Sequence, residues 1–142
     1  DIYLPARYKD EGKLTKLNYY LDVSGSVTKK DILRFNSEFK YVKDTYRPEE
    51  MTQILFNTGI VSEKVIKENE EFTDAIFNTR GGTSLYYVRE HIIKTQPTAA
   101  VIFTDLGCAP MATLPFDIPI IWVVVGKIKS PVPFGTPIYI DL

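Results

Sequence analysis

At 142 residues, with 44% hydrophobic and 13% aromatic side chains, the chain is long enough to bury one complete core, so we expect one domain. A net charge of -1 with basic residues spread along the sequence argues against nucleic acid as a partner. The longest apolar run, 118–125, contains Pro119 and is shorter than the roughly 20 residues of a membrane-spanning helix, which argues against a membrane segment. The single cysteine, Cys108, cannot form an internal disulfide, so we expect a reducing, cytoplasmic location.

The first organised segment begins at Leu17. Residues 1–16 mix charges with proline and glycine and predict a lead-in segment ahead of a domain spanning 17–142. Apolar residues then alternate from Leu17 to Val23 and predict a strand that ends in the turn "SGS". Thr28 is a suitable N-cap for a helix that Pro48 must stop. The sequence begins at Asp1 rather than at a methionine, so we expect it to be a piece of a longer protein.

The middle of the chain predicts a hairpin followed by a turn region. Residues 51–57 and 60–66 have the composition of two strands joined by a tight Thr-Gly turn. Residues 68–78 predict a short helix or a turn, because apolar residues at helical spacing are flanked by polar ones. The sequence "TRGGTS" at 79–84 breaks any regular structure.

The last part of the chain predicts one helix and three strands. Leu85, Val88 and Ile92 have helical spacing and precede Pro97. Buried strands are predicted at 98–104 and 118–126, with a short one at 136–142. Apolar strands alternating with amphipathic helices predict an α/β fold: an open, mostly parallel twisted sheet of Rossmann-like type, with one antiparallel edge strand and helices on both faces.

Polar side chains with oxygen atoms follow three of these elements at the predicted carboxyl edge of the sheet, where ligands of such folds bind. They are Asp22, Ser24, Ser26, Thr83 and Asp105. Two carboxylates and three hydroxyls, without histidine or thiol, suit Mg²⁺, Mn²⁺ or Ca²⁺ rather than zinc or copper. Taken singly, each motif is better explained by a capped turn or a helix cap than by a metal site. Neither His91 nor Cys108 receives a role from its sequence context.

The quoted residues resemble a known pattern. "DVSGS", Thr83 and Asp105 are similar to the metal-ion-dependent adhesion site of the von Willebrand factor A (VWA) domain, in which Asp-x-Ser-x-Ser is followed by a distant Thr and a distant Asp. "SEF", "RGGTS", "FTDLG", "IIWVVVG" and "PFG" resemble more narrowly the C-terminal VWA-like domain of bacterial and phage proteins labelled as metallopeptidases. Two positions depart from that pattern: Ser84, where an acid is usual, and Leu106, where glycine often stands.

The resemblance implies a function as well as a fold. Ser24, Ser26 and Thr83 would contact a divalent cation directly, Mg²⁺ before Mn²⁺ or Ca²⁺, while Asp22 and Asp105 would hold it through water. The chain would then be a non-catalytic module that captures an exposed Asp or Glu of a protein partner, and ring-forming ATPases of the AAA+ class are the partners that the resemblance suggests.

Two other hypotheses stay open at this point. One is a Mg²⁺-dependent phosphatase of the haloacid dehalogenase type, with Asp22 as its nucleophile. The chain has Ser24 where that chemistry uses a second acid, and it lacks a histidine base or a Cys-His pair for other mechanisms. The other is a structural domain with a vestigial site.

Overall fold

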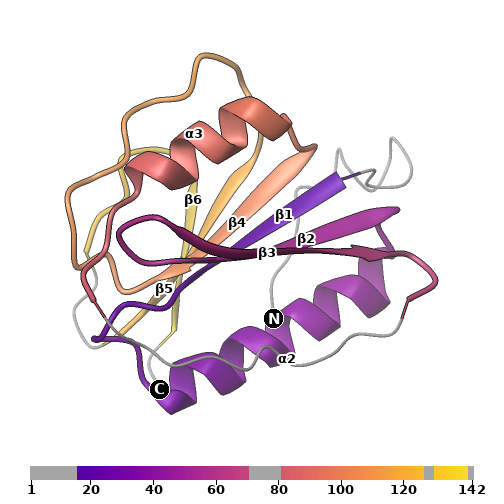
Figure 1. Cartoon of the computed structure of the whole chain (residues 1–142), viewed down its shortest axis with the longest axis horizontal. Coiled ribbons are helices and arrows are strands. Elements are labelled where there is room, and N and C mark those ends of the chain that lie inside the picture. Colours follow the sequence, from indigo (N-terminus) through magenta and orange to yellow (C-terminus); the bar gives the residue numbers. More distant parts are fainter. Residues whose placement is uncertain (1–15, 71–80, 127–129, 141–142) are drawn as a thin grey trace.

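The computed structural model describes residues 16–70, 81–126 and 130–140, which form a six-stranded sheet with one helix packed on each face (Figure 1). The strand order is β3-β2-β1-β4-β5-β6. The elements are β1 (Lys16–Asp22), α2 (Lys29–Tyr46), β2 (Glu50–Phe56), β3 (Ile60–Lys67), α3 (Tyr86–Thr95), β4 (Ala99–Thr104), β5 (Ile120–Val125) and β6 (Thr136–Ile140). The α/β fold class predicted from the sequence is confirmed.

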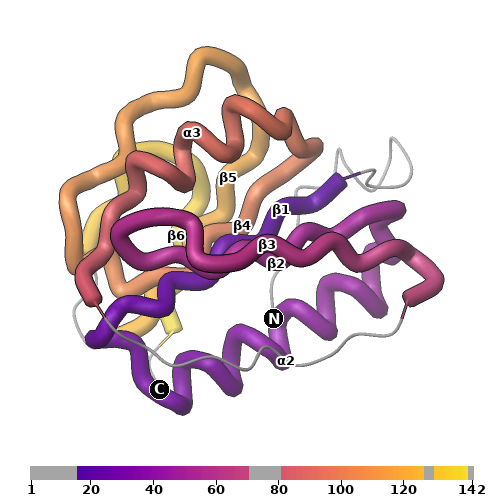
Figure 2. Tube along the Cα trace, viewed as in Figure 1, coloured from indigo at the N-terminus to yellow at the C-terminus, as the bar shows by residue number. Residues whose placement is uncertain are grey.

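The order in which strands are added to the sheet reverses between β1 and β4, which are themselves parallel neighbours. From β1 the chain runs outward through α2 to β2 and β3, and it then returns through α3 to β4 on the other side of β1 (Figure 2). All neighbouring strands are parallel except β2 and β3, which form the predicted antiparallel hairpin at the edge. In open α/β sheets a reversal of this kind leaves a crevice at the carboxyl ends of the two central strands.

Local signals fix both ends of α2. The Thr28 side chain accepts a hydrogen bond from the Asp31 N–H at 3.2 Å, and the Asp31 carboxylate accepts one from the Thr28 N–H at 2.8 Å. This reciprocal capping box satisfies two backbone donors that a helix start otherwise leaves unpaired. At the other end Arg47 adopts a left-handed conformation directly before Pro48. The predicted N-cap and stop are both confirmed.

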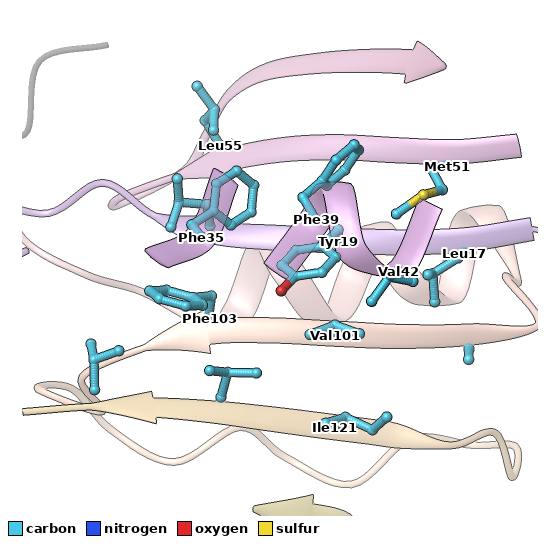
Figure 3. Close-up of a cluster of buried hydrophobic side chains, with 14 of the residues drawn as sticks. Leu17, Tyr19, Phe35, Phe39, Val42, Met51, Leu55, Val101, Phe103 and Ile121 are labelled. Carbon is cyan, nitrogen blue, oxygen red and sulfur yellow. The ribbon is translucent and has the colours of Figure 1, made fainter. Parts of the chain in front are cut away.

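Two apolar clusters, one on each face, hold the layers together. On the α2 face Tyr19 lies edge-on to Phe35, with ring centroids 5.0 Å apart, and Phe103 contacts the same ring of Phe35 (Figure 3). On the α3 face Val88 and Ile92 pack against side chains of the central strands, among them Trp122. Both faces of the central strands are therefore buried, which explains why their sequences are continuous apolar runs.

The remaining predictions differ from the structure mainly at element ends. The strand predicted at 98–104 begins at Ala99, and the one predicted at 118–126 covers Ile120–Val125. Residues 68–70 form a turn, while 71–78 of the same prediction lie outside the described residues, as do 1–15 of the lead-in and 141–142 of the last strand. Neither described helix is long and apolar enough to cross a membrane.

Candidate functional site

Asp22 and Asp105 come together because β1 and β4 are parallel neighbours. Leu21 pairs with Phe103 in the register of these strands, so Asp22, the last residue of β1, lies beside Thr104 and next to Asp105. This is the point of the sheet where the strand order reverses. The structure therefore brings both predicted acidic residues to the carboxyl edge of the central strands.

The "SGS" turn is folded around the Asp22 carboxylate. Its Oδ1 accepts a hydrogen bond from the Ser24 N–H at 2.8 Å, and the Ser24 carbonyl accepts one from the Val27 N–H at 3.1 Å. The hydroxyl oxygens of Ser24 and Ser26 consequently lie 3.3 Å apart. Ser24 is buried and Ser26 is exposed, so this pair of hydroxyls extends from the protein interior to the surface.

Thr104 holds the other oxygen of the same carboxylate. Its Oγ1 donates to Asp22 Oδ2 at 2.7 Å and accepts a hydrogen bond from the Leu106 N–H at 3.2 Å. Leu106 has a φ of 59°, a left-handed conformation that is uncommon for a branched residue and marks a constrained loop directly after Asp105. Sequence reasoning missed Thr104; the available signal was a hydroxyl at the end of an apolar strand, and its meaning depends on the strand register.

Burial dominates the electrostatics of this pair of acids. The pKa of Asp22, which has no exposed surface, is raised by burial, lowered by hydrogen bonds from Ser24 and Thr104, and raised again by the nearby charge of Asp105; the net direction is upward. The same two carboxylates add to burial in raising the pKa of the Cys108 thiol to about 11. The field at this edge of the sheet is therefore negative, and it favours a cation.

The third predicted segment, "GGTS", packs against the first. The Gly25 N–H donates to the Gly81 carbonyl at 3.0 Å, and Gly81 has a φ of 79°, which only glycine adopts readily. The Ser84 N–H donates to the Asn57 carbonyl at 2.7 Å, which fixes this segment to the turn of the hairpin as well. Thr83, half-buried, lies between these two anchors. Asn57 is a second positioning residue that the sequence did not reveal.

The five predicted residues thus lie in three segments that meet at one edge, with Asp22 inside the protein and Ser26 and Asp105 nearer to the surface. Asp105 is half-buried, and its Oδ1 accepts a hydrogen bond from the Gly107 N–H at 3.0 Å. Among the described residues no three His, Cys, Asp or Glu side chains group together as in a zinc site. The donor set of this edge is hydroxyl and carboxylate oxygen, which fits a hard divalent cation.

His91 lies on the α3 face and makes two contacts that the sequence did not predict. Its Nδ1 lies 2.7 Å from the Tyr20 hydroxyl, and its Nε2 lies 2.5 Å from the Glu63 carboxylate. Its side chain is only 9% exposed, so it is packed rather than solvated. These contacts occupy both ring nitrogens, and they give the imidazole a structural role between α3 and β3.

The family described as VWA-like domain (DUF2201) matches the chain over residues 17–141. Two solved structures have a similar fold. The conserved hypothetical protein BatB from Bacteroides thetaiotaomicron superposes with a TM-score of 0.55 at 12% identity, covering 79% of this chain and 67% of that one. The ArnB paralog VWA2 from Sulfolobus acidocaldarius gives a TM-score of 0.52 at 14% identity, covering 81% of this chain and 36% of that one. At such identities the likeness shows the fold alone. No curated protein matches the chain.

Proposed function

The chain belongs to the VWA-like domain family DUF2201, and from this premise we propose that it is a protein-binding module that uses a divalent cation, Mg²⁺ before Mn²⁺ or Ca²⁺, to bind an acidic residue of a partner. The residues proposed to hold the cation are Asp22, Ser24, Ser26, Thr83 and Asp105. A bound cation would supply an electrophilic centre that accepts a carboxylate oxygen from the partner.

The arrangement of Asp22 is the observation that carries this proposal. Both of its oxygens accept hydrogen bonds inside the protein, one from Ser24 and one from Thr104. The carboxylate therefore supplies negative charge and positions the Ser24 and Ser26 hydroxyls. Because hydroxyls are neutral, they do not cancel the charge of a cation, which keeps its affinity for a further anionic ligand.

The same arrangement disfavours the phosphatase hypothesis. A nucleophilic aspartate needs an oxygen that can reach the phosphorus atom, whereas Asp22 has no exposed surface. His91, the single histidine of the chain, is held by Tyr20 and Glu63 on another part of the molecule. We therefore propose binding without turnover for this domain.

Retention of a partner in the presence and absence of a chelator tests the proposal. The tagged chain should retain a partner from its native lysate, with AAA+ ATPases as the first class to look for, in Mg²⁺ and lose it in EDTA. Ser26→Ala should release the same partner, because it removes an exposed hydroxyl of the site without opening a cavity. Ser62→Ala, an exposed serine on β3, is the matched control and should retain it.

Two outcomes would contradict the proposal. One is a partner that stays bound in EDTA and in Ser26→Ala. The other is Mg²⁺-dependent hydrolysis of an aryl phosphate that is lost in Asp22→Asn, which would favour the phosphatase hypothesis.

A further inference from the structure

A pocket of about 300 Å³ lies directly beside the proposed cation site, between the start of α3 and the loop that follows β4. Leu85 and Met111, both nearly fully buried, line its apolar side. Thr83, one of the five proposed site residues, also lines it, together with the exposed ring of Tyr86. Thr83 belongs to both the cation site and the pocket. If a partner residue binds at the cation site, a residue one or two positions away along the partner chain can therefore reach the pocket.

The size and lining of the pocket fit one large side chain. Its volume is at the lower limit for sites that bury a whole small-molecule ligand. Besides Leu85 and Met111, the loop contributes small or apolar residues, Ala109, Pro110 and Ala112. A smaller pocket of about 220 Å³ shares Leu85, Pro110 and Met111 and extends to Leu106, beside Asp105. Apolar surface therefore continues along one side of the site.

Arg89 lines the pocket and places a positive charge at its edge. Its Nε donates to the Thr113 carbonyl at 2.9 Å, which ties α3 to the loop across the pocket. Its Nη1 lies 3.5 Å from the exposed Glu90 carboxylate, a distance that balances the charge only in part. Tyr86, 60% exposed, and Tyr87, 50% exposed, stand at the same end of α3 as an edge-to-face pair. Exposed aromatic rings and arginine are the side chains enriched at protein–protein contacts.

We propose that this pocket receives a large apolar side chain, such as Leu, Met or Phe, that lies within two residues of the acidic residue bound at the cation site. The partner segment is thus acidic and apolar together, with Arg89 favouring its negative charge and Leu85 and Met111 burying its apolar side chain. This inference rests on the proposed function, and it goes further by naming the second determinant of the partner sequence.

Capped tetrapeptides test this inference on the full chain by NMR titration of its backbone amides in Mg²⁺. The probes are acetyl-Gly-Asp-Leu-Gly-amide, the same peptide with Ser in place of Leu, and the same peptide with Asn in place of Asp. The Asp-Leu peptide should bind about tenfold more tightly than the Asp-Ser peptide, because it buries a leucine side chain. It should shift the amide signals of Leu85 and Met111, and the Asn-Leu peptide should bind far more weakly.

Ala112→Trp provides the matched variant. Ala112 is exposed and lines the pocket, so a tryptophan there fills the pocket without disturbing the core, and Ala112→Ser is its control. The tenfold preference for Leu should disappear in Ala112→Trp and persist in Ala112→Ser, while both variants bind Mg²⁺ as the wild type does.

The outcomes separate this inference from the proposed function. If Mg²⁺ binds and the two Asp peptides bind equally, or if Ala112→Trp keeps the preference, the pocket is not the second determinant and the proposed function stands. If Mg²⁺ binds but neither Asp peptide does, capture of an acidic residue at the cation fails, and the proposed function fails with it. If no Mg²⁺ binds, the proposed function fails and the inference falls with it.

Discussion

Thr104 holds one oxygen of the buried Asp22 carboxylate by a side-chain hydrogen bond. Its hydroxyl is fully buried and links Asp22 to the backbone of Leu106. A buried acceptor that loses a donor stays desolvated without compensation. Valine has a methyl group of similar size in place of the threonine hydroxyl, which makes this bond directly testable.

We predict that Thr104→Val lowers the free energy of unfolding by about 1–3 kcal/mol, because Asp22 Oδ2 loses its buried donor while the volume of the side chain is kept. Urea unfolding followed by circular dichroism measures the change. The control is Thr52→Val, at a half-buried threonine on β2, which should change stability by about 0.5 kcal/mol or less. Equal effects of the two substitutions would contradict the role of Thr104.

The raised pKa of Asp22 predicts a specific dependence of stability on pH. Since the folded chain holds this proton above the ordinary aspartate pKa of 3.8 at which the unfolded chain releases it, folding takes up protons between the two values. The free energy of unfolding therefore falls as pH rises through this interval, and the loss is complete above the folded-state pKa.

Asp22→Asn should remove that part of the pH dependence. Unfolding of both proteins in chelator, measured at a series of pH values from the ordinary aspartate pKa upward, should show the wild type losing stability relative to the variant. Parallel curves would mean that Asp22 ionises in the folded state as it does in the unfolded chain.

At the scale of elements, His91 connects α3 to the sheet and to the edge hairpin. The Asn18 amide donates to the Tyr20 hydroxyl at 3.0 Å, the same hydroxyl forms a hydrogen bond with His91 Nδ1 at 2.7 Å, and His91 Nε2 forms one with the Glu63 carboxylate. Burial of the phenol raises the pKa of Tyr20 above its ordinary range, so it stays a donor. The chain of bonds runs from β1 through α3 to β3.

We predict that His91→Phe lowers the free energy of unfolding by about 1–3 kcal/mol, because the ring still packs on Tyr20 but no longer forms a hydrogen bond with its hydroxyl. Glu63→Gln, at the exposed end, should cost less than about 1 kcal/mol. Adding Tyr20→Phe to His91→Phe should recover part of the loss, since both partners are then apolar. Strictly additive losses in this double-mutant cycle would contradict the bond.

The helices and most strands were predictable because their signals are local. Thr28 and Pro48 mark the ends of α2 within the sequence itself, and alternation from Leu17 places β1. The contacts of His91 were not predictable, because Tyr20 is 71 residues and Glu63 28 residues away along the chain. The same reason hid Thr104, whose partner Asp22 is 82 residues distant. Such pairs depend on strand register, which a single sequence does not specify.

At the scale of the molecule, the strand order brings the three polar segments to one edge. The sequence predicted a mostly parallel sheet with an antiparallel hairpin. It identified two of the three segments because acidic and hydroxyl residues follow apolar strands, and the third because Thr83 follows a glycine pair. It did not indicate that β1 and β4 are neighbours at the point of reversal. Nor did it indicate the pocket beside Thr83, because the loop after β4 has no periodicity from which its path could be predicted.

If the edge holds a cation, the whole fold should gain stability from it. We predict that Mg²⁺ at one hundred times its dissociation constant raises the free energy of unfolding by about 2.7 kcal/mol, because only the folded chain assembles the three segments. Thermal unfolding with Mg²⁺ and with EDTA measures the gain. Ser26→Ala should show a smaller gain at the same Mg²⁺ concentration, whereas Ser62→Ala should match the wild type.

The most direct test of the cation site is a titration of the chain with Mn²⁺, a paramagnetic ion that broadens the NMR signals of amides close to it. The account predicts that the signals of residues 22–27, 81–84 and 105–107 broaden together at low Mn²⁺, that Mg²⁺ restores them, and that Ser26→Ala weakens the effect. Broadening centred on the exposed acidic residues elsewhere, or on one of the three segments without the others, would contradict it.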